Sequence, residues 1–172
     1  MATPTTLPST FVAGNVLTAA EMNNLRGAFR VLQVASVTKA NTFSTSSTTF
    51  VDVTDLTISI TPSATSSKVL IIFNISMAGS TTNDIFANLV RGSTAIAQSS
   101  GATNNATFAG FTSSTAALNT WCSSYLDSPA TTSATTYKFQ LRAGSDTAYV
   151  NRRGADTANG SVSTITVMEI SA

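Results

Sequence analysis

The apolar positions of the chain change their period near Val31. Before it, one stripe follows spacings of three, four and three residues, made of Met22, Leu25, Phe29 and Leu32. This is the spacing of one face of an amphipathic helix. From Val31 on, short segments alternate apolar and polar residues, which is typical of β-strands with one buried face. The pattern predicts one short helix followed by a β-domain.

The start of this helix is marked by a capping box and a hydrophobic staple. Thr18 can accept the amide hydrogen of Glu21, and the Glu21 carboxylate can reach back to the threonine amide. Leu17 and Met22 flank this cap as the staple pair. A helix of about a dozen residues that contains Gly27 is marginal alone in water. Its stripe therefore either covers the open end of the β-domain, or it self-associates in a short parallel bundle or docks into a larger particle.

Residues 1–13 are predicted to form an extended arm. Pro4 and Pro8 restrict themselves and the residues before them to extended geometry. Phe11 is one of the few apolar side chains that such an arm could place in a partner's groove. A disordered tail is the alternative.

The β-domain is predicted to contain about ten short strands and no helix. Alternation is clean in residues 56–61 and 137–142, a hairpin turns at Gly92, and a closing strand runs to residue 170. Residues 69–73 are apolar on both faces, which predicts a central strand covered on both sides. Strands spaced about eight to twelve residues apart indicate an antiparallel jelly roll or β-sandwich.

The composition points to a surface covered by hydroxyl groups. Charged residues make up 10% of the chain and hydrophobic residues 42%, whereas serine and threonine together make up roughly a third. The net charge of +1 gives no electrostatic reason to expect a nucleic acid or an anionic membrane as partner. No stretch approaches the roughly 18 apolar residues of a membrane-spanning helix, and the N-terminus has no signal-peptide pattern. We therefore expect no nucleic-acid partner and no membrane insertion.

Candidate catalytic and metal-binding residues are few. Histidine, the usual general base and metal ligand, is absent from the sequence. The single cysteine, Cys122, excludes an intramolecular disulfide and a cysteine-built zinc site, and we interpret it as a small buried residue beside Trp121. Trp121 and Tyr125 could stack on sugar rings as in a lectin, but burial in the core is the favoured interpretation.

The carboxylates do not form a convincing catalytic pair. Asp52 with Asp55, and Asp146 with Asp156, are the closest in sequence. Each lies in a turn-like stretch, where aspartate commonly bonds to nearby backbone amides. No phosphate loop, dinucleotide fingerprint or EF-hand spacing occurs. We expect no enzymatic activity, no cofactor and no metal.

The N-terminal phrase resembles the attachment segment of small bacteriophage fibre and tail-associated proteins. In these a G-x-x-L-T-A-x-x-x-N phrase precedes a hydroxyl-rich β-domain. Its counterparts here are Gly14, Leu17, Thr18, Ala19 and Asn23. The β-domain, with its ITPSATSSKVLIIFNIS run (residues 60–76) and closing ITVMEI, resembles in style the jelly-roll heads of phage fibres, which are similar in outline to the trimeric tumour-necrosis-factor fold.

The resemblance implies a homotrimer that other virion proteins hold by its N-terminus. Residues 1–32 would be the attachment and trimerisation segment and residues 33–172 the jelly-roll head. The candidate attachment residues are Phe11, Leu17, Met22, Leu25, Phe29 and Leu32. The chain would be a short tail fibre or spike of a virion assembled in the host bacterial cytoplasm. The alternative is a capsid decoration or head-fibre protein.

A candidate receptor-contact tip follows from antiparallel alternation. If the final strand returns toward the N-terminal base, loop 151–160 lies at the far end of the domain, and we expect loop 128–135 beside it. The candidate contact residues are Asn151, Arg152, Arg153, Asp156 and Asn159. The two arginines either belong to a solvated turn or grip a carboxylate or phosphate of the host surface, a polysaccharide or a protein.

Overall fold

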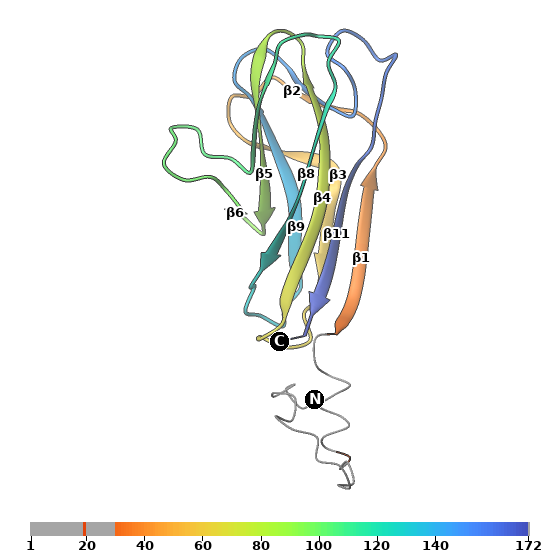
Figure 1. Ribbon diagram of the computed structural model, residues 1–172, viewed down its shortest axis with the longest axis vertical. Helices are drawn as coiled ribbons and strands as arrows, with labels where there is room; N and C mark the ends of the chain where they lie inside the picture. Colours follow the sequence, from red (N-terminus) through yellow and green to blue (C-terminus); the bar gives the residue numbers. More distant parts are fainter. Residues whose placement is uncertain (1–18, 20–29, 172) are drawn as a thin grey trace, which may run out of the picture.

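Eleven strands form a two-layered jelly-roll sandwich in the computed structural model, which describes Ala19 and residues 30–171 (Figure 1). This confirms the predicted mainly-β fold. The strands are β1 (Val31–Lys39), β2 (Phe43–Thr45), β3 (Val51–Ile60), β4 (Lys68–Gly79), β5 (Asn83–Arg91), β6 (Thr94–Ile96), β7 (Phe108–Thr112), β8 (Asn119–Asp127), β9 (Thr135–Ala143), β10 (Ala148–Val150) and β11 (Ser163–Ile170).

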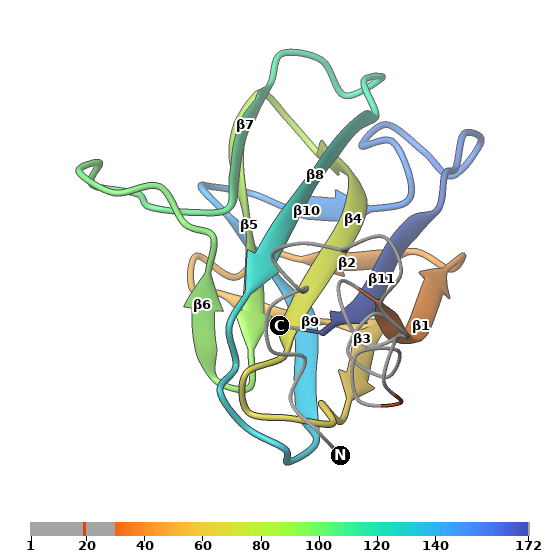
Figure 2. The same ribbon diagram turned by 60° about the horizontal axis from the view of Figure 1, so that its bottom comes forward.

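All the strand pairs are antiparallel. The six-stranded sheet has the order β1-β11-β4-β10-β2, and β8 also pairs with β4. The five-stranded sheet has the order β3-β9-β5-β6, and β7 pairs with β5. β4 lies in the middle of its sheet because β8 pairs along one of its edges, whereas β11 and then β10 pair along the other edge (Figure 2).

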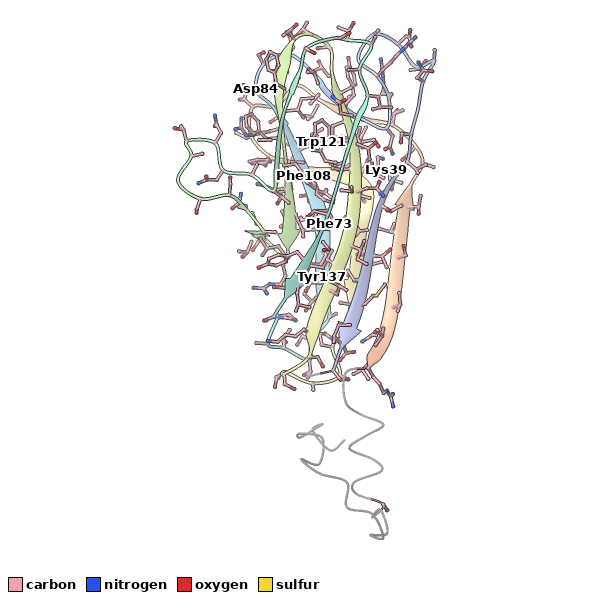
Figure 3. All side chains as sticks on the ribbon, viewed as in Figure 1. Lys39, Phe73, Asp84, Phe108, Trp121 and Tyr137 are labelled. Atoms are coloured by element: carbon pink, nitrogen blue, oxygen red, sulfur yellow. The ribbon has the colours of Figure 1, made fainter. Side chains whose placement is uncertain are left out.

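The core lies between the two sheets, where alternate residues of β9 and β11 and of the first half of β4 are buried. Phe73, Phe108 and Phe139 form an aromatic cluster with ring centroids 5.4 to 6.4 Å apart. Phe73 comes from the six-stranded sheet, and the other two rings come from the five-stranded sheet (Figure 3). Rings at these separations add to the free energy gained by burying their area. The cluster joins the two layers near the middle of the sandwich.

The alternation in β3 is interrupted by a bulge. Asp55 has a φ of 61°, and the register of β3 on β9 shifts between Asp52 and Thr57. Val53 and Leu56 are consequently both buried although they are three residues apart. An aspartate tolerates the left-handed conformation that the bulge requires.

The expected N-terminal helix lies almost entirely outside the described residues. Ala19 is helical, and Phe11, Leu17, Met22, Leu25 and Phe29 fall outside the description. Leu32, predicted as the last residue of the helical stripe, lies instead in β1. The helical spacing was wrong for Leu32, whereas the change of period predicted at Val31 is confirmed, because Val31 pairs with Ile170 of β11 and begins the sheet.

The two ends of the β-domain are hydrogen-bonded to each other. The Arg30 amide donates to Ser171 Oγ at 2.9 Å, and the Ser171 amide donates to the Arg30 carbonyl at 2.9 Å. We call this the basal end of the sandwich, which is the lower end in Figure 1. The opposite end is the distal end.

Candidate functional site

The distal end is built from loops that hydrogen-bond to one another. The β4–β5 loop donates from the Ser80 amide to the Thr147 carbonyl of the β9–β10 loop at 2.8 Å. The β10–β11 loop donates from the Ala155 amide to the Thr115 carbonyl of the β7–β8 loop, also at 2.8 Å. These loops lie together at the top of Figure 1. Loop 151–160 is thus part of a surface at the end opposite the basal end, and hydrogen bonds between the loops hold this surface together.

Loop 128–135 lies at the other end of the molecule, so the expectation that it stands beside loop 151–160 was wrong. β8 and β11 both run antiparallel to β4. Val69 pairs with Asp127, and Lys68 pairs with Ile170. Both strands therefore finish at the basal end, and the loop after β8 begins there.

Asn151 anchors the distal loop from inside the protein. Its side chain is 1% exposed, and its amide donates to the carbonyls of Lys39 at 2.8 Å and Asn41 at 3.1 Å. Its side-chain oxygen accepts from Ser163 Oγ at 2.7 Å, and its φ is 61°. A buried side chain with these partners cannot meet a receptor, so its assignment as a contact residue is corrected: Asn151 positions the loop.

The charges of the distal loop are largely paired within it. Arg153 Nε and Nη2 each donate to one carboxylate oxygen of Asp156 at 2.6 Å. Asp156 also accepts from the Ala158 amide at 2.8 Å. The hydrogen bonds from Arg153, followed by that from Ala158, lower the pKa of Asp156 to about 2. The Arg152 guanidinium lies 4.2 Å from the ring centroid of Tyr149, in a cation–π contact.

Gly154 brings this loop directly against the end of β4. A Cβ at residue 154 would overlap the Gly79 carbonyl oxygen and would lie 2.7 Å from its carbonyl carbon. A glycine is required because backbone meets backbone there. No feature of the sequence identified this contact.

The distal loop can therefore present a polar surface of defined shape. Arg152 and Arg153 are half-buried, and Asp156 and Asn159 are exposed. Guanidinium and amide groups held in this way can donate to carboxylate, phosphate or hydroxyl oxygens. Within residues 30–171 and Ala19, no group of three or more metal-ligating side chains is found.

The four carboxylates considered for catalysis have separate partners. Asp52 accepts from Lys138 Nζ at 2.6 Å and from Gln140. Asp55 accepts from Asn41 at 2.9 Å, and Asp146 accepts from Thr81 at 2.7 Å. Asp156 is held by Arg153 as described. Each therefore serves a local contact of its own.

The aromatic residues of β8 point toward the core, whereas its cysteine points outward. Trp121 and Tyr125 pack against the hydrophobic core, and the Trp121 ring lies over Gly110, where a Cβ would come within 2.5 Å of it. Cys122 is exposed, so its predicted burial was wrong. Neighbouring residues of a strand face opposite sides, and the larger Trp121 takes the inner side.

Two buried carboxylates were missed because their partners are distant in sequence. Glu169 is 1% exposed and accepts from the Ser63 amide at 2.7 Å, from Ser63 Oγ at 2.6 Å and from Gln33 Nε2 at 2.6 Å. Asp127 accepts from Arg91 at 2.7 Å and from the Tyr137 hydroxyl at 2.7 Å. These bonds satisfy groups whose burial would otherwise be costly.

The described residues include no helix long and apolar enough to cross a membrane. Neither a protein-family model nor a curated protein matches the sequence. Among solved structures, the chain is similar to one in the structure of infectious bursal disease virus Gx strain, with 17% identity and a TM-score of 0.42. The match covers 80% of this chain and 41% of that chain, so this chain spans less than half of the longer one. At a TM-score below 0.5 this likeness does not bear on function.

Proposed function

We propose that the chain is a non-enzymatic structural protein of a virus particle, a short homotrimeric fibre or spike of a phage tail that attaches to the host surface. The observation that carries the proposal is the polarity of the sandwich. Residues 1–29 join the β-domain at Arg30, which is hydrogen-bonded to Ser171 at the basal end. A chain held through its N-terminal residues presents the distal loops outward.

The chemistry of the distal loop supports contact with a host polysaccharide or protein. The loop offers guanidinium, amide and carboxylate groups held by Asn151 and by the Gly154 contact. Recognition of hydroxyl-rich or anionic surface groups uses such preorganised donors and acceptors. The low density of charge on the rest of the surface limits nonspecific electrostatic binding.

The test of host attachment is phage adsorption with a matched control. The double variant Arg153→Ala, Asn159→Ala removes one guanidinium and one amide group from the surface of the loop. The control is Lys138→Ala, because the side-chain exposures of the Lys138–Asp52 pair, 20% and 52%, resemble the 24% and 47% of Arg153–Asp156. We expect normal incorporation for both variants and about tenfold weaker equilibrium adsorption to host cells for the double variant alone, the effect of losing about 1.4 kcal/mol of contact. Unchanged adsorption would refute the receptor role.

The test of virion attachment uses the N-terminal stripe. Leu25→Glu with Phe29→Glu should leave the chain folded but absent from purified particles, because charged residues would replace the apolar contact.

The number of wild-type copies per particle separates the two virion roles. A number that matches tail symmetry supports the tail fibre or spike, whereas one that matches the capsid lattice points supports decoration of the capsid. Loss of viscosity of a host polysaccharide incubated with purified protein would refute the non-enzymatic role.

A further inference from the structure

Four neighbouring strands carry an apolar row across the outer face of the six-stranded sheet. The strand order in this region is β8, β4, β11 and β1 (Figure 2). Their register places Leu126, Leu70, Met168 and Val34 opposite one another. Leu126 and Val34 are 55% and 57% exposed, and Leu70 and Met168 are half-buried.

The row is widened on both sides by further apolar residues. Ile72 of β4, toward the distal end, is 45% exposed. Toward the basal end, Ile170 pairs with Val31, which is 49% exposed. At about 4.8 Å between strands, the row is about 14 Å wide from β8 to β1. We call these residues the basal patch: Val31, Val34, Leu70, Ile72, Leu126, Met168 and Ile170.

The surroundings of the basal patch are neutral. The next row toward the distal end carries Ser124, Thr166 and Ser36 around Ile72. Along the described β1, β4, β8 and β11, Lys68 at the basal rim is the one charged side chain on this face, and it donates to Ser128 Oγ at 2.9 Å. A neutral face with an apolar centre has the composition of an interface core, from which charge is depleted.

A nearly neutral sheet face can pack against other copies of itself. Along these strands, copies bring together no charged side chain except Lys68 at the basal rim, which Ser128 holds, and their small hydroxyl side chains allow close approach. Residues 69–73 of β4 have the sequence of a strand buried on both faces, yet over residues 68–74 only the inner face is buried in one chain. Association at the basal patch would also bring the Arg30 ends of the copies near one another, so their N-terminal segments would leave from one place.

We propose that copies of this chain associate through the basal patch. This inference deepens the homotrimer of the proposed function by naming its contact surface: the basal patch of each copy faces the other two around the three-fold axis. It rests on that assembly rather than on attachment to the host. Leu126 and Val34 are the outermost side chains of the row, on β8 and β1. They contact the neighbouring copy and lose water when the assembly forms.

The test is the mass of the full chain in solution, measured by light scattering across a range of concentrations. The variant Leu126→Gln, Val34→Thr makes the two ends of the row polar. The control Phe111→Gln, Val162→Thr makes equivalent changes at side chains that are 60% and 48% exposed outside the patch. We expect the wild type and the control to form oligomers that dissociate at the same protein concentration. The patch variant should associate at least about 100-fold more weakly, as loss of two buried apolar contacts implies.

A second measurement does not depend on the patch variant folding. In the full chain with Cys122→Ser and Ser124→Cys, the thiol at residue 124 lies in the row beside the patch. Its reaction with a maleimide should be slow at concentrations where the protein is an oligomer and fast after dilution to monomers. A monomeric wild type would overturn the proposal, as would an oligomer in which this thiol stays reactive or a patch variant that assembles as tightly as the wild type. A monomeric wild type would also refute the homotrimer of the proposed function. The adsorption test is independent of all these results, so the contact surface and the host-attachment role fail separately.

Discussion

Replacing Asn151 by alanine should remove the main support of the distal loop. The side chain makes three buried hydrogen bonds, two to the carbonyls of Lys39 and Asn41 and one with Ser163. Each is worth about 1 kcal/mol net. Alanine would also adopt a φ of 61° at a cost of about 1 kcal/mol, which asparagine bears more easily. The expected loss in the free energy of unfolding is therefore about 3 to 4 kcal/mol.

Two further substitutions separate the hydrogen bonds from the backbone conformation. Asn151→Gly loses the same bonds but accepts the positive φ, so it should be about 1 kcal/mol more stable than Asn151→Ala. Asn151→Asp keeps the acceptor for Ser163 but turns a carboxylate oxygen toward two carbonyl oxygens. It should be no more stable than the alanine variant.

The assay is urea unfolding of all four proteins at one concentration, since association shifts the apparent stability. In a parallel thermal unfolding experiment, a loss of 3 to 4 kcal/mol in the free energy of unfolding should lower the Tm of a chain of this size by roughly 10 °C. A loss below about 1 kcal/mol in Asn151→Ala would refute the hydrogen-bond argument. A glycine variant no more stable than the alanine variant would refute the conformational one.

Three more predictions concern buried or crowded positions. Burial alone would raise the pKa of Glu169, but hydrogen bonds to its carboxylate outweigh this and hold the pKa below its ordinary value of 4.5. Its contribution to stability is thus present above pH 4.5 and lost as the pH falls through the folded-state pKa, and Glu169→Gln should flatten this acid-side loss in unfolding experiments. The Tyr137 hydroxyl donates to buried Asp127 at 2.7 Å, so Tyr137→Phe should cost about 1 to 2 kcal/mol at neutral pH. Because burial and the nearby Asp127 raise the pKa of Tyr137, the variant should also lack one tyrosine that ionises only on unfolding in an alkaline absorbance titration. Gly154→Ala should lower stability by about 1 to 3 kcal/mol and displace the loop from Gly79, which calorimetry and the adsorption assay would detect.

The sequence pattern was sufficient for most strands because one face of each is buried. β9 is the clearest case: Tyr137, Phe139 and Leu141 are buried, and the residues between them are half-buried. The same alternation failed for Cys122, since periodicity shows that two neighbours face opposite sides but not which faces the core. The bulge at Asp55 was also invisible, because a single positive φ leaves the overall apolar pattern of β3 nearly intact.

Predicting which loops lie at the distal end required knowledge of the strand topology. Placing loop 151–160 needed only the direction of the last strand, but placing loop 128–135 needed the partner of β8 as well. That partner is β4, and the sequence of β8 does not indicate with which strand it pairs. The burial of Asn151 had the same cause, because its partners Lys39 and Asn41 lie more than 100 residues away.

The outer face of β4 is a different case, because its apolar sequence pattern predicts burial whereas the fold of one chain leaves it exposed. Residues 69–73 have the pattern of a strand covered on two sides, and the core covers one side: Val69, Ile71 and Phe73 are buried, whereas Ile72 is 45% exposed. A chain that stayed monomeric could have carried threonine at residues 70 and 72, as β11 does at residues 164 and 166 of the same face. The apolar residues at these outward positions therefore favour a surface that is covered in the working assembly, and the neutral rows around them agree with the proposed contact between copies of this chain.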